Sequence, residues 1–385
     1  MSGRLLRLVC AGATAAGVLL SPAPATAAPE PGPTSGTEDR QSVASLLTDL
    51  QRLYRDAERA TETYNGTDEK LKKQRAEVNR LDARLTRARL SLHDSRGAAG
   101  RLARQQYQSS GEISSYVRLL LARDPQHALD QGHLIGQLSL ERAGAVRRVA
   151  GSEQRTDILA RAARKALDAQ LSLAARQRKE RDEVRARLDD VQTLLASLTA
   201  EQLAELDRFE KAGTAAAQRK VMASGALSSV RPPSREGEEA LRYAVGQIGK
   251  PYEWGAEGPA AYDCSGLTSQ AWERAGLTIP RTSQEQWARL PEIPLSDLRP
   301  GDLVIYFPEA THVAIYLGEG MVVQAPRPGS KVKVSPIAAN PLLGAVRPDP
   351  DGKPLGRYTP PKLPAGAMEG SDEGYASGPP AAPST

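Results

Sequence analysis

Apolar side chains recur in alternating steps of four and three residues between positions 46 and 92, and this spacing constrains the fold more than any other feature of the chain. Such steps form the heptad seam of a coiled coil. Two polar residues, Thr67 and Gln74, interrupt the seam. The apolar or near-apolar seam positions are Leu46, Leu50, Leu53, Ala57, Ala60, Tyr64, Leu71, Val78, Leu81, Leu85, Ala88 and Leu92.

A second stretch, residues 152–211, repeats this pattern. We therefore expect residues 41–212 to form an antiparallel coiled-coil hairpin with short helices at its tip, although dimerisation through the same seam is an alternative. A helix of about 60 residues spans roughly 90 Å, and so narrow a rod serves as a spacer, a docking element or a cover rather than as a catalytic pocket. The second seam is clearest at Val184, Leu188, Val191, Leu195 and Leu198, and the expected helix breakers are Gly111, Asp124-Pro125, Gly132, Gly136 and Gly144.

The N-terminus has the pattern of a secretory signal peptide over residues 1–28. Arg4 and Arg7 precede an apolar run, and Ala25-Thr26-Ala27 offers a small-residue cleavage site. The apolar run is shorter than the roughly 20 residues that a membrane span needs. We expect a secreted, extracytoplasmic protein associated with the cell wall. Residues 29–40, rich in Pro, Gly, Thr and Ser, are expected to form a flexible spacer.

Removal of the signal would leave Cys264 as the single cysteine, because Cys10 lies inside the cleaved segment. An intramolecular disulfide is then impossible, and the thiol is an intermolecular link, a tolerated buried group or a reactive group. The second half of the chain holds one cysteine and one histidine, which argues against a four-ligand metal site. We expect no metal and no cofactor.

Charge is distributed unevenly along the chain. Residues 31–235 carry 36 Lys and Arg against 27 Asp and Glu, a net charge of +9, whereas residues 236–347 carry 10 against 13, a net charge of −3. The basic part fits an anionic surface such as a wall polymer, or simply a solvated Arg-rich helix face. No nucleic-acid-binding motif accompanies it, so we expect no nucleic-acid partner.

Composition then sets the remaining boundaries. Residues 213–235 lose the heptad pattern and end in Arg231-Pro232-Pro233-Ser234, which indicates a linker. Residues 348–385 are rich in Pro, Gly and Ala and are expected to be disordered. The compact domain therefore lies at residues 236–347, about 110 residues, a common domain size.

Within this domain, Cys264 precedes a segment of helical propensity at residues 268–275. A cysteine at a helix N-terminus is placed where the helix dipole stabilises a thiolate. Three β-type runs follow at residues 302–306, 312–317 and 321–324, and His312 opens the middle one. A cysteine on a helix facing a histidine on a strand is the papain-type layout, in which the imidazole takes the thiol proton.

Five blocks then appear in the order and spacing of the NlpC-type cell-wall peptidases, which the domain resembles. The resemblance implies an α+β, papain-like fold and hydrolysis of peptidoglycan stem peptides, usually between D-glutamate and diaminopimelate. It also implies that Cys264 is the nucleophile and His312 the base. The blocks are Lys250 to Gly255, Asp263 to Leu267, Pro280 to Ser283, Pro300 to Leu303 and His312 to Tyr316.

The family's third polar residue falls on Gln324, where a histidine is more common. Its amide oxygen can accept a hydrogen bond from the imidazole and fix one tautomer, although it carries no charge to stabilise imidazolium. Candidates for the substrate groove, or alternatively for turn and cap contacts, are Tyr252, Asp263, Ser265 and Arg281.

Two other functions fit the same residues. A Cys–His pair also supports a cell-wall amidase or acyltransferase, and an inactive coiled-coil adaptor is the alternative outside catalysis. Similar hydrolases with coiled-coil N-terminal regions stay inactive until a membrane-bound cell-division partner docks on the coil. By this resemblance the rod or the 213–235 linker is expected to cover the groove around Cys264, with Pro232-Pro233 allowing release; a passive spacer is the alternative.

Overall fold

The computed structural model describes residues 35–109, 117, 120–121, 124–227 and 231–370. The expected signal peptide lies outside these residues, as do residues 371–385 of the expected tail. The chain divides into two units, Met1–Ser42 and Val43–Thr385. In the first unit the described part is the beginning of helix α1 at Ser35, so residues 35–40 of the expected spacer are helical.

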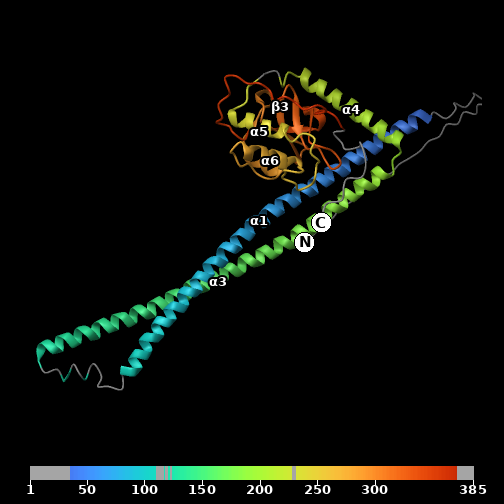
Figure 1. Cartoon of the computed structure of the whole chain (residues 1–385). Coiled ribbons are helices and arrows are strands. Elements are labelled where there is room, and N and C mark those ends of the chain that lie inside the picture. Colours follow the sequence, from blue (N-terminus) through green and yellow to red (C-terminus); the bar gives the residue numbers. More distant parts are fainter. Residues whose placement is uncertain (1–34, 110–116, 118–119, 122–123, 228–230, 371–385) are drawn as a thin grey trace, which may run out of the picture. The chain divides into compact units, whose positions relative to one another are not determined.

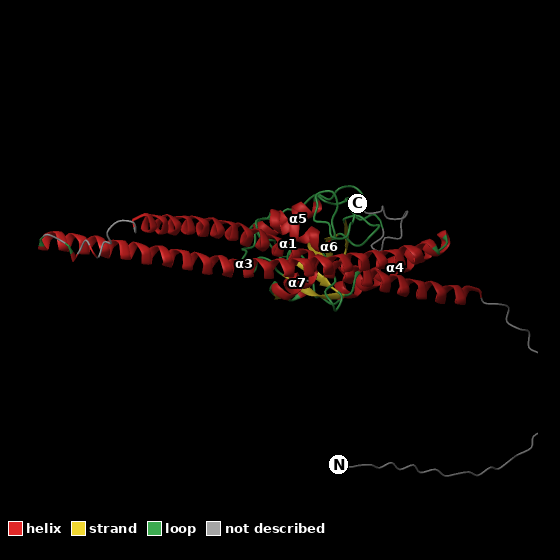
Figure 2. Ribbon diagram, turned by 90° about the horizontal axis from the view of Figure 1, so that it is seen from below, coloured by secondary structure: helices red, strands yellow, loops and turns green. Residues whose placement is uncertain are grey.

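Helices α1 (Ser35–Ser109) and α3 (Pro125–Ala196) lie side by side and run in opposite directions (Figures 1 and 2). Gln74 Nε2 donates to the carbonyl of Ala166 at 2.8 Å, and the Ser95 and Ser152 hydroxyls are 3.4 Å apart. As residue numbers rise on one helix they fall on the other, which is the predicted antiparallel pairing. The predicted seam residues that are buried include Leu50, Ala57, Leu71, Leu81, Leu85, Val184 and Val191.

The predicted breaks within the helical region are partly wrong. Asp124 does begin a helix, because its side chain caps α3 by accepting from the His127 amide at 2.9 Å. Gly132, Gly136 and Gly144, however, lie inside α3. A glycine costs about 1 kcal/mol in a helix interior, which a helix of 72 residues tolerates at three positions.

The second helix ends earlier than predicted, at Ala196, and a new helix begins after a turn. Thr199 caps α4 (Ala200–Ala223) through a reciprocal pair of contacts with Gln202. Residues 213–223, predicted to be linker, are therefore helical. The Gln218 side chain accepts from the Ala338 amide and donates to the Gly320 carbonyl, so that α4 is fixed to the compact domain that follows.

The proline segment is also fixed to the domain, contrary to the prediction of a free linker. Pro233 is buried, and its carbonyl accepts from the Leu355 amide at 2.8 Å. Arg231 forms an ion pair with Asp297 at 2.7 Å. The composition was typical of a linker, but these contacts hold its backbone in place.

The compact domain is α+β, as predicted, with an antiparallel sheet in the order β1-β6-β2-β3-β4-β5. The three predicted strands correspond to β2, β3 and β4. The strands are β1 (Glu292–Ile293), β2 (Leu303–Tyr306), β3 (His312–Gly318), β4 (Met321–Gln324), β5 (Lys333–Pro336) and β6 (Leu342–Val346); the helices are α5 (Arg235–Val245), α6 (Cys264–Arg274) and α7 (Ser283–Arg289), with 3-10 turns η1 (Leu295–Asp297) and η2 (Ile337–Ala339).

Both faces of this sheet are covered, because the alternating side chains of β3 enter two different cores. Val313 and Ile315 pack with residues of α5 and α6. Ala314 and Tyr316 belong to the core on the opposite face, against which Val221 of α4 packs. The sheet therefore holds α6, with Cys264 at its start, on one face.

The first part of the predicted disordered tail is ordered. Ala367 is buried in the core and its carbonyl accepts from the Val334 amide at 2.8 Å. Asp349 forms an ion pair with Arg299 at 3.0 Å. Residues 348–370 lack regular secondary structure, as their composition suggests, yet backbone hydrogen bonds fix them to the domain.

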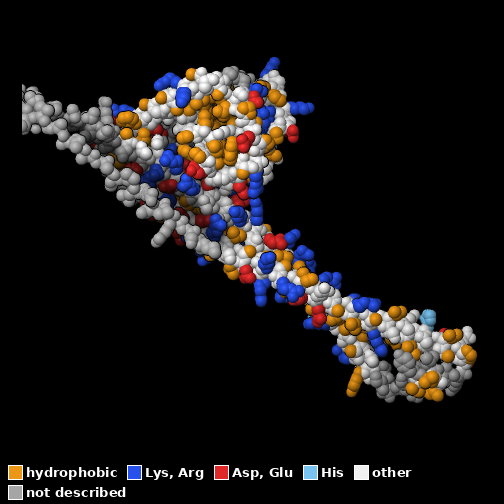
Figure 3. All heavy atoms as spheres, turned by 180° about the vertical axis from the view of Figure 1, so that it is seen from behind, with side chains coloured by type: hydrophobic (Ala, Val, Ile, Leu, Met, Phe, Trp, Pro, Cys, Tyr) orange, Lys and Arg blue, Asp and Glu red, His pale blue; other side chains and the backbone are white. Residues whose placement is uncertain are grey.

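The helical region carries charges of both signs on its surface. Figure 3 shows Lys and Arg side chains interspersed with Asp and Glu along the hairpin on the face in view. Among the described residues, no helix has the length and apolar character that crossing a membrane requires.

Candidate active site

Cys264 is the first residue of helix α6 and its thiol is buried. Asp263 caps the helix by accepting from the Gly266 amide at 2.6 Å, which fixes the backbone that presents the sulfur. The pKa of the Cys264 thiol lies well above its ordinary value because of burial and the facing carboxylates of Glu62, Asp263 and Glu58. The expected stabilisation of a thiolate at the helix N-terminus is therefore outweighed in this conformation.

His312 begins strand β3 and is fully buried. Its Nε2 lies 2.7 Å from Gln324 Oε1 on β4, as expected from the sequence. An amide oxygen only accepts, so this contact puts a hydrogen on Nε2 and leaves Nδ1 to take a proton. The backbone amide of Val313, the next residue, faces the Cys264 sulfur and lowers the thiol pKa slightly against the other effects.

Three of the predicted substrate residues form one buried network beside the nucleophile. The Arg281 guanidinium donates to both Asp263 oxygens, at 2.7 and 3.1 Å, and to Ser265 Oγ at 2.8 Å. Asp263 also accepts from the Gly255 amide at 2.9 Å. Asp263 thus has the cap and turn contacts that were the alternative to a substrate contact. It joins the loop at residue 255 to the start of α6.

Tyr252, the fourth predicted substrate residue, is buried next to the same charges. Burial raises the pKa of its hydroxyl well above the ordinary value, and the negative charges of Cys264, Asp263 and the α1 carboxylates act in the same direction. The hydroxyl is therefore a hydrogen-bond donor at any physiological pH.

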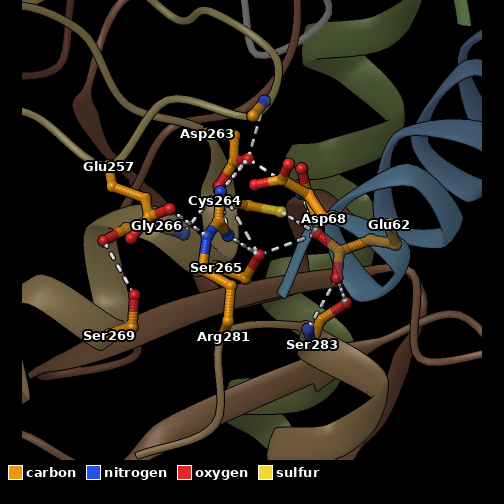
Figure 4. Close-up of polar contacts among 12 residues, drawn as sticks. Glu62, Asp68, Glu257, Asp263, Cys264, Ser265, Gly266, Ser269, Arg281 and Ser283 are labelled. Carbon is orange, nitrogen blue, oxygen red and sulfur yellow. Dashed lines mark hydrogen bonds and ion pairs between the residues drawn. The ribbon is translucent and has the colours of Figure 1, made fainter. Parts of the chain in front are cut away.

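The rod was expected to cover this groove, but the sequence did not predict which of its side chains would enter the site. Helix α1 supplies them (Figure 4). One Glu62 oxygen accepts from Ser265 Oγ at 2.7 Å and lies 4.0 Å from Cys264 Sγ. Its other oxygen accepts from the Ser283 amide at 2.7 Å and the Ser283 hydroxyl at 3.0 Å. Glu62 is 2% exposed, so the carboxylate fills the space in front of the nucleophile.

Two neighbours of Glu62 on α1 contact the rest of the site. Glu58 Oε1 lies 3.4 Å from His312 Nδ1, the nitrogen that the Gln324 contact leaves available. Asn65 Nδ2 donates to Asp263 at 3.0 Å. In this conformation α1 therefore occupies the positions in front of both the cysteine and the histidine.

Contacts of α1 continue on both sides of Cys264. On one side Arg59 pairs with Glu309 at 3.3 Å, and the guanidinium of Arg327 lies 4.7 Å from the centre of the Tyr54 ring. On the other side Lys72 pairs with Glu257 at 3.0 Å. Most of these contacts join opposite charges, which matches the opposite net charges of the two regions.

Burial changes the ionisation of the carboxylate that faces Cys264. It raises the pKa of Glu62 to about 7, and the charge of Asp263 acts in the same direction, against the opposing effects of Arg281 and the Ser265 and Ser283 hydrogen bonds. Nowhere among the described residues, this site included, are three His, Cys, Asp or Glu side chains grouped in the way that a metal ion requires.

A signal for these α1 residues was present in the sequence. Buried positions 54, 58, 61, 62 and 65 recur at helical spacing but fall on a different face from the heptad seam. Most of them are polar, so a search for apolar periodicity passes over them. A polar stripe containing Tyr54 and Asn65 on an otherwise regular heptad helix is the pattern that marks a second contact face.

A cysteine at a helix N-terminus, with a histidine on the adjoining sheet held by an amide, is the layout of papain-type hydrolases. A family model described as the NlpC/P60 family matches residues 249–343. The chain therefore contains an NlpC/P60 domain.

Similar proteins are named as endopeptidases. A "Probable endopeptidase" of Corynebacterium glutamicum is 42% identical over 125 residues, which cover 32% of this chain and 59% of that protein. The "Peptidoglycan endopeptidase RipA" of Mycolicibacterium smegmatis is 39% identical over 27% of this chain and 25% of its own length. The chain thus spans less than two thirds of these relatives.

One similar solved structure is described as that of a protein without catalytic activity. RipD from Mycobacterium tuberculosis is 29% identical, with a TM-score of 0.28, over 30% of this chain and 98% of that one. Its title describes a non-catalytic NlpC/p60 domain protein adapted to peptidoglycan binding.

Proposed function

We propose that this protein is a secreted peptidoglycan endopeptidase that cleaves stem peptides, at the bond between D-glutamate and diaminopimelate, with Cys264 as nucleophile. The observation that supports it best is the joint placement of Cys264 at the start of α6 and of the His312–Gln324 pair on β3 and β4 within an NlpC/P60 domain. The names of the relatives agree with the reaction class.

The chemistry follows from the atoms available. His312 Nδ1 takes the thiol proton, and the sulfur attacks the peptide carbonyl to form a tetrahedral intermediate. As the C–N bond breaks, the imidazolium returns the proton to the leaving amine, and a thioester remains on Cys264. Water, deprotonated by the same nitrogen, then hydrolyses the thioester. Gln324 keeps the hydrogen on Nε2 throughout and so leaves Nδ1 free for each transfer.

In the conformation described here the enzyme is latent. Glu62 occupies the space in front of the sulfur and Glu58 faces the base, so no peptide carbonyl can approach. The same two carboxylates raise the pKa of Cys264, which disfavours the thiolate. Helix α1 therefore inhibits the site both by occupying it and by its charge, which supports a regulatory role of the hairpin over that of a passive spacer.

Release requires α1 to leave the groove, and the packing indicates where the chain bends. Helix α4 and the proline segment are both fixed to the catalytic domain, so Pro232-Pro233 is an unsuitable hinge. The short turn between Ala196 and Ala200 joins α3 to α4, and the backbone hydrogen bonds of Ser197 and Leu198 in it are local. We assign the hinge to this turn, with a membrane-bound cell-division partner docking on the hairpin as the trigger suggested by the resemblance.

An amidase or acyltransferase would use the same cysteine and histidine, so the product decides the reaction. The test uses a release variant, the full chain carrying Glu58→Lys and Glu62→Lys, which places like charge against Arg281. Incubated with purified peptidoglycan, it should expose new amino groups on diaminopimelate. Release at the sugar–peptide junction would identify an amidase instead, and no cleavage of any bond would favour a binding protein such as RipD is described to be.

A further inference from the structure

Helix α1 occupies the groove as a ligand would. Its side chains therefore show which chemical groups the groove can bind. The carboxylate of Glu62 lies on hydroxyl and amide donors. The ammonium group of Lys72 lies on the carboxylate of Glu257, with Nζ 3.0 Å from Oε1. A site that holds an ammonium group here accepts one on a flexible alkyl chain, because that is what a lysine side chain presents.

Glu257 has too little positive charge around it once α1 is removed. Its Oε1 lies 3.3 Å from Arg281 Nε, but Arg281 already donates two hydrogen bonds to Asp263. Arg281 and Lys72 are the two cations that lower the pKa of Glu257 against the opposing effect of burial. Without Lys72, two carboxylates share one guanidinium, and one negative charge in the groove lacks a partner.

With α1 in place, a small cavity lies beside Glu257. A cavity of about 160 Å³ lies between α1 and the loop at residues 254–257. On the domain side it is lined by Trp254, Gly255, Glu257 and Arg281. The Tyr64 ring of α1 packs edge-on against Trp254, with ring centres 5.0 Å apart. Departure of α1 would uncover an indole beside a carboxylate, a pair suited to an alkyl ammonium group.

We propose that Glu257 is a specificity-determining residue that binds the side-chain amino group of the diamino acid in the stem peptide. This inference rests on the proposed function and adds a substrate preference to it. A diamino acid carries a second amino group, which is a neutral amide in a stem that contributes this amine to a crosslink and a free ammonium otherwise. The enzyme therefore selects stems whose side-chain amine is not part of a crosslink.

The test compares two tetrapeptides, L-Ala-D-Glu-diaminopimelate-D-Ala and the same peptide acetylated on the side-chain amine. The release variant is the parent, and Glu257→Gln is added to it. The matched control is Glu309→Gln. Like Glu257, Glu309 is a carboxylate that forms an ion pair with a basic side chain of α1, in this case Arg59. For each chain both kcat/KM and peptide affinity, from intrinsic tryptophan fluorescence, are measured.

The parent should prefer the free amine by about tenfold, the usual size of a charge-assisted hydrogen bond at a partly exposed site. Glu257→Gln should remove this preference through KM, whereas Glu309→Gln should keep it. A parent that shows no preference, or a Glu257→Gln chain that retains it, would overturn the assignment. If the parent binds both peptides and cuts neither, the proposed reaction fails, while the affinities still decide the role of Glu257.

Discussion

The carboxylate of Glu62 accepts two hydrogen bonds from Ser283, a residue 221 positions further along the chain. One comes from the backbone amide and the other from the hydroxyl, and Ser265 donates a third. A long helix thereby binds the catalytic domain as a ligand, directly in front of Cys264. Under the proposed function, this contact makes access to Cys264 depend on the position of the hairpin.

Replacing Glu62 should therefore activate the full chain. Glu62→Arg removes three hydrogen bonds to a charged group and places a cation near Arg281, so the open population should rise at least about tenfold, because each such bond contributes roughly 1.5–3 kcal/mol. The rate of Cys264 alkylation and the rate of muropeptide hydrolysis both report this. The control is Glu77→Arg, an exposed α1 residue that pairs with Arg80 on its own helix. Equal rates for Glu62→Arg and the native chain would mean that Glu62 does not hold α1 in place.

Latency should weaken as the pH rises. The pKa of Glu62 is about 7 with α1 seated and returns toward its ordinary value of 4.5 when the side chain becomes solvated. The closed state thus holds the proton more tightly. Its extra stability is complete below about pH 4.5 and is lost as the pH passes through about 7, a difference of up to roughly 3 kcal/mol.

This pH effect is measured as the rate of Cys264 alkylation between pH 5 and 9, divided by the rate of the release variant at each pH. The division removes the ordinary titration of the thiol. The ratio should rise with pH in the native chain and should be nearly flat in Glu62→Gln, which cannot ionise. A ratio that falls with pH would contradict the assignment of Glu62, and so would an unchanged slope in Glu62→Gln. The charges facing Glu62 are those of Asp263, Arg281 and Cys264.

Cys264→Ala and His312→Ala should each abolish turnover in the release variant. The first removes the nucleophile with little change in volume, and the second removes the base while Gln324 loses its partner. Circular dichroism and the melting temperature verify that the fold persists. Wild-type turnover of muropeptides by the Cys264→Ala chain would exclude the cysteine mechanism.

Gln324→Ala should lower kcat in the release variant while KM changes little. Gln324 touches the base rather than the substrate, and positioning of a general base commonly contributes on the order of 10²-fold. Gln324→His restores a hydrogen-bond partner for Nε2 and should recover most of the rate. If Gln324→Ala showed unchanged kinetics, another group or water would have to orient the imidazole.

The positions of Cys264 and His312 were more predictable from sequence than the α1 contacts that cover them. Cys264 and His312 are singular in their region, and their neighbours form turn and strand patterns, so local signals place them. Strands β1, β5 and β6 were not predicted. β1 spans two residues and β5 ends in a proline, so neither carries a clear alternation.

Contacts between distant segments left weaker signals. Glu58, Glu62 and Asn65 are polar, and a polar residue on a coiled-coil helix is ordinarily solvated. Their burial depends on the docking of a domain about 200 residues away, and the polar stripe at helical spacing indicates a second contact face without indicating what binds there. The proline segment and residues 348–370 show the reverse case, because a composition typical of flexible chain is fixed by backbone hydrogen bonds to the domain.

The most direct test of the account is a reversible lock between α1 and the catalytic domain. A Cβ added at Gly66 would lie 3.9 Å from Thr282 Cγ2, so the side chains of Gly66→Cys and Thr282→Cys would meet across this contact. The oxidised double variant should form the cross-link readily and show no hydrolysis of muropeptides, and reductant should restore the rate of the native chain. Gly66→Cys alone, treated in the same way, should keep one rate throughout. Failure of the cross-link to form, or hydrolysis by the cross-linked chain as fast as by the reduced one, would show that α1 does not close the site around Cys264.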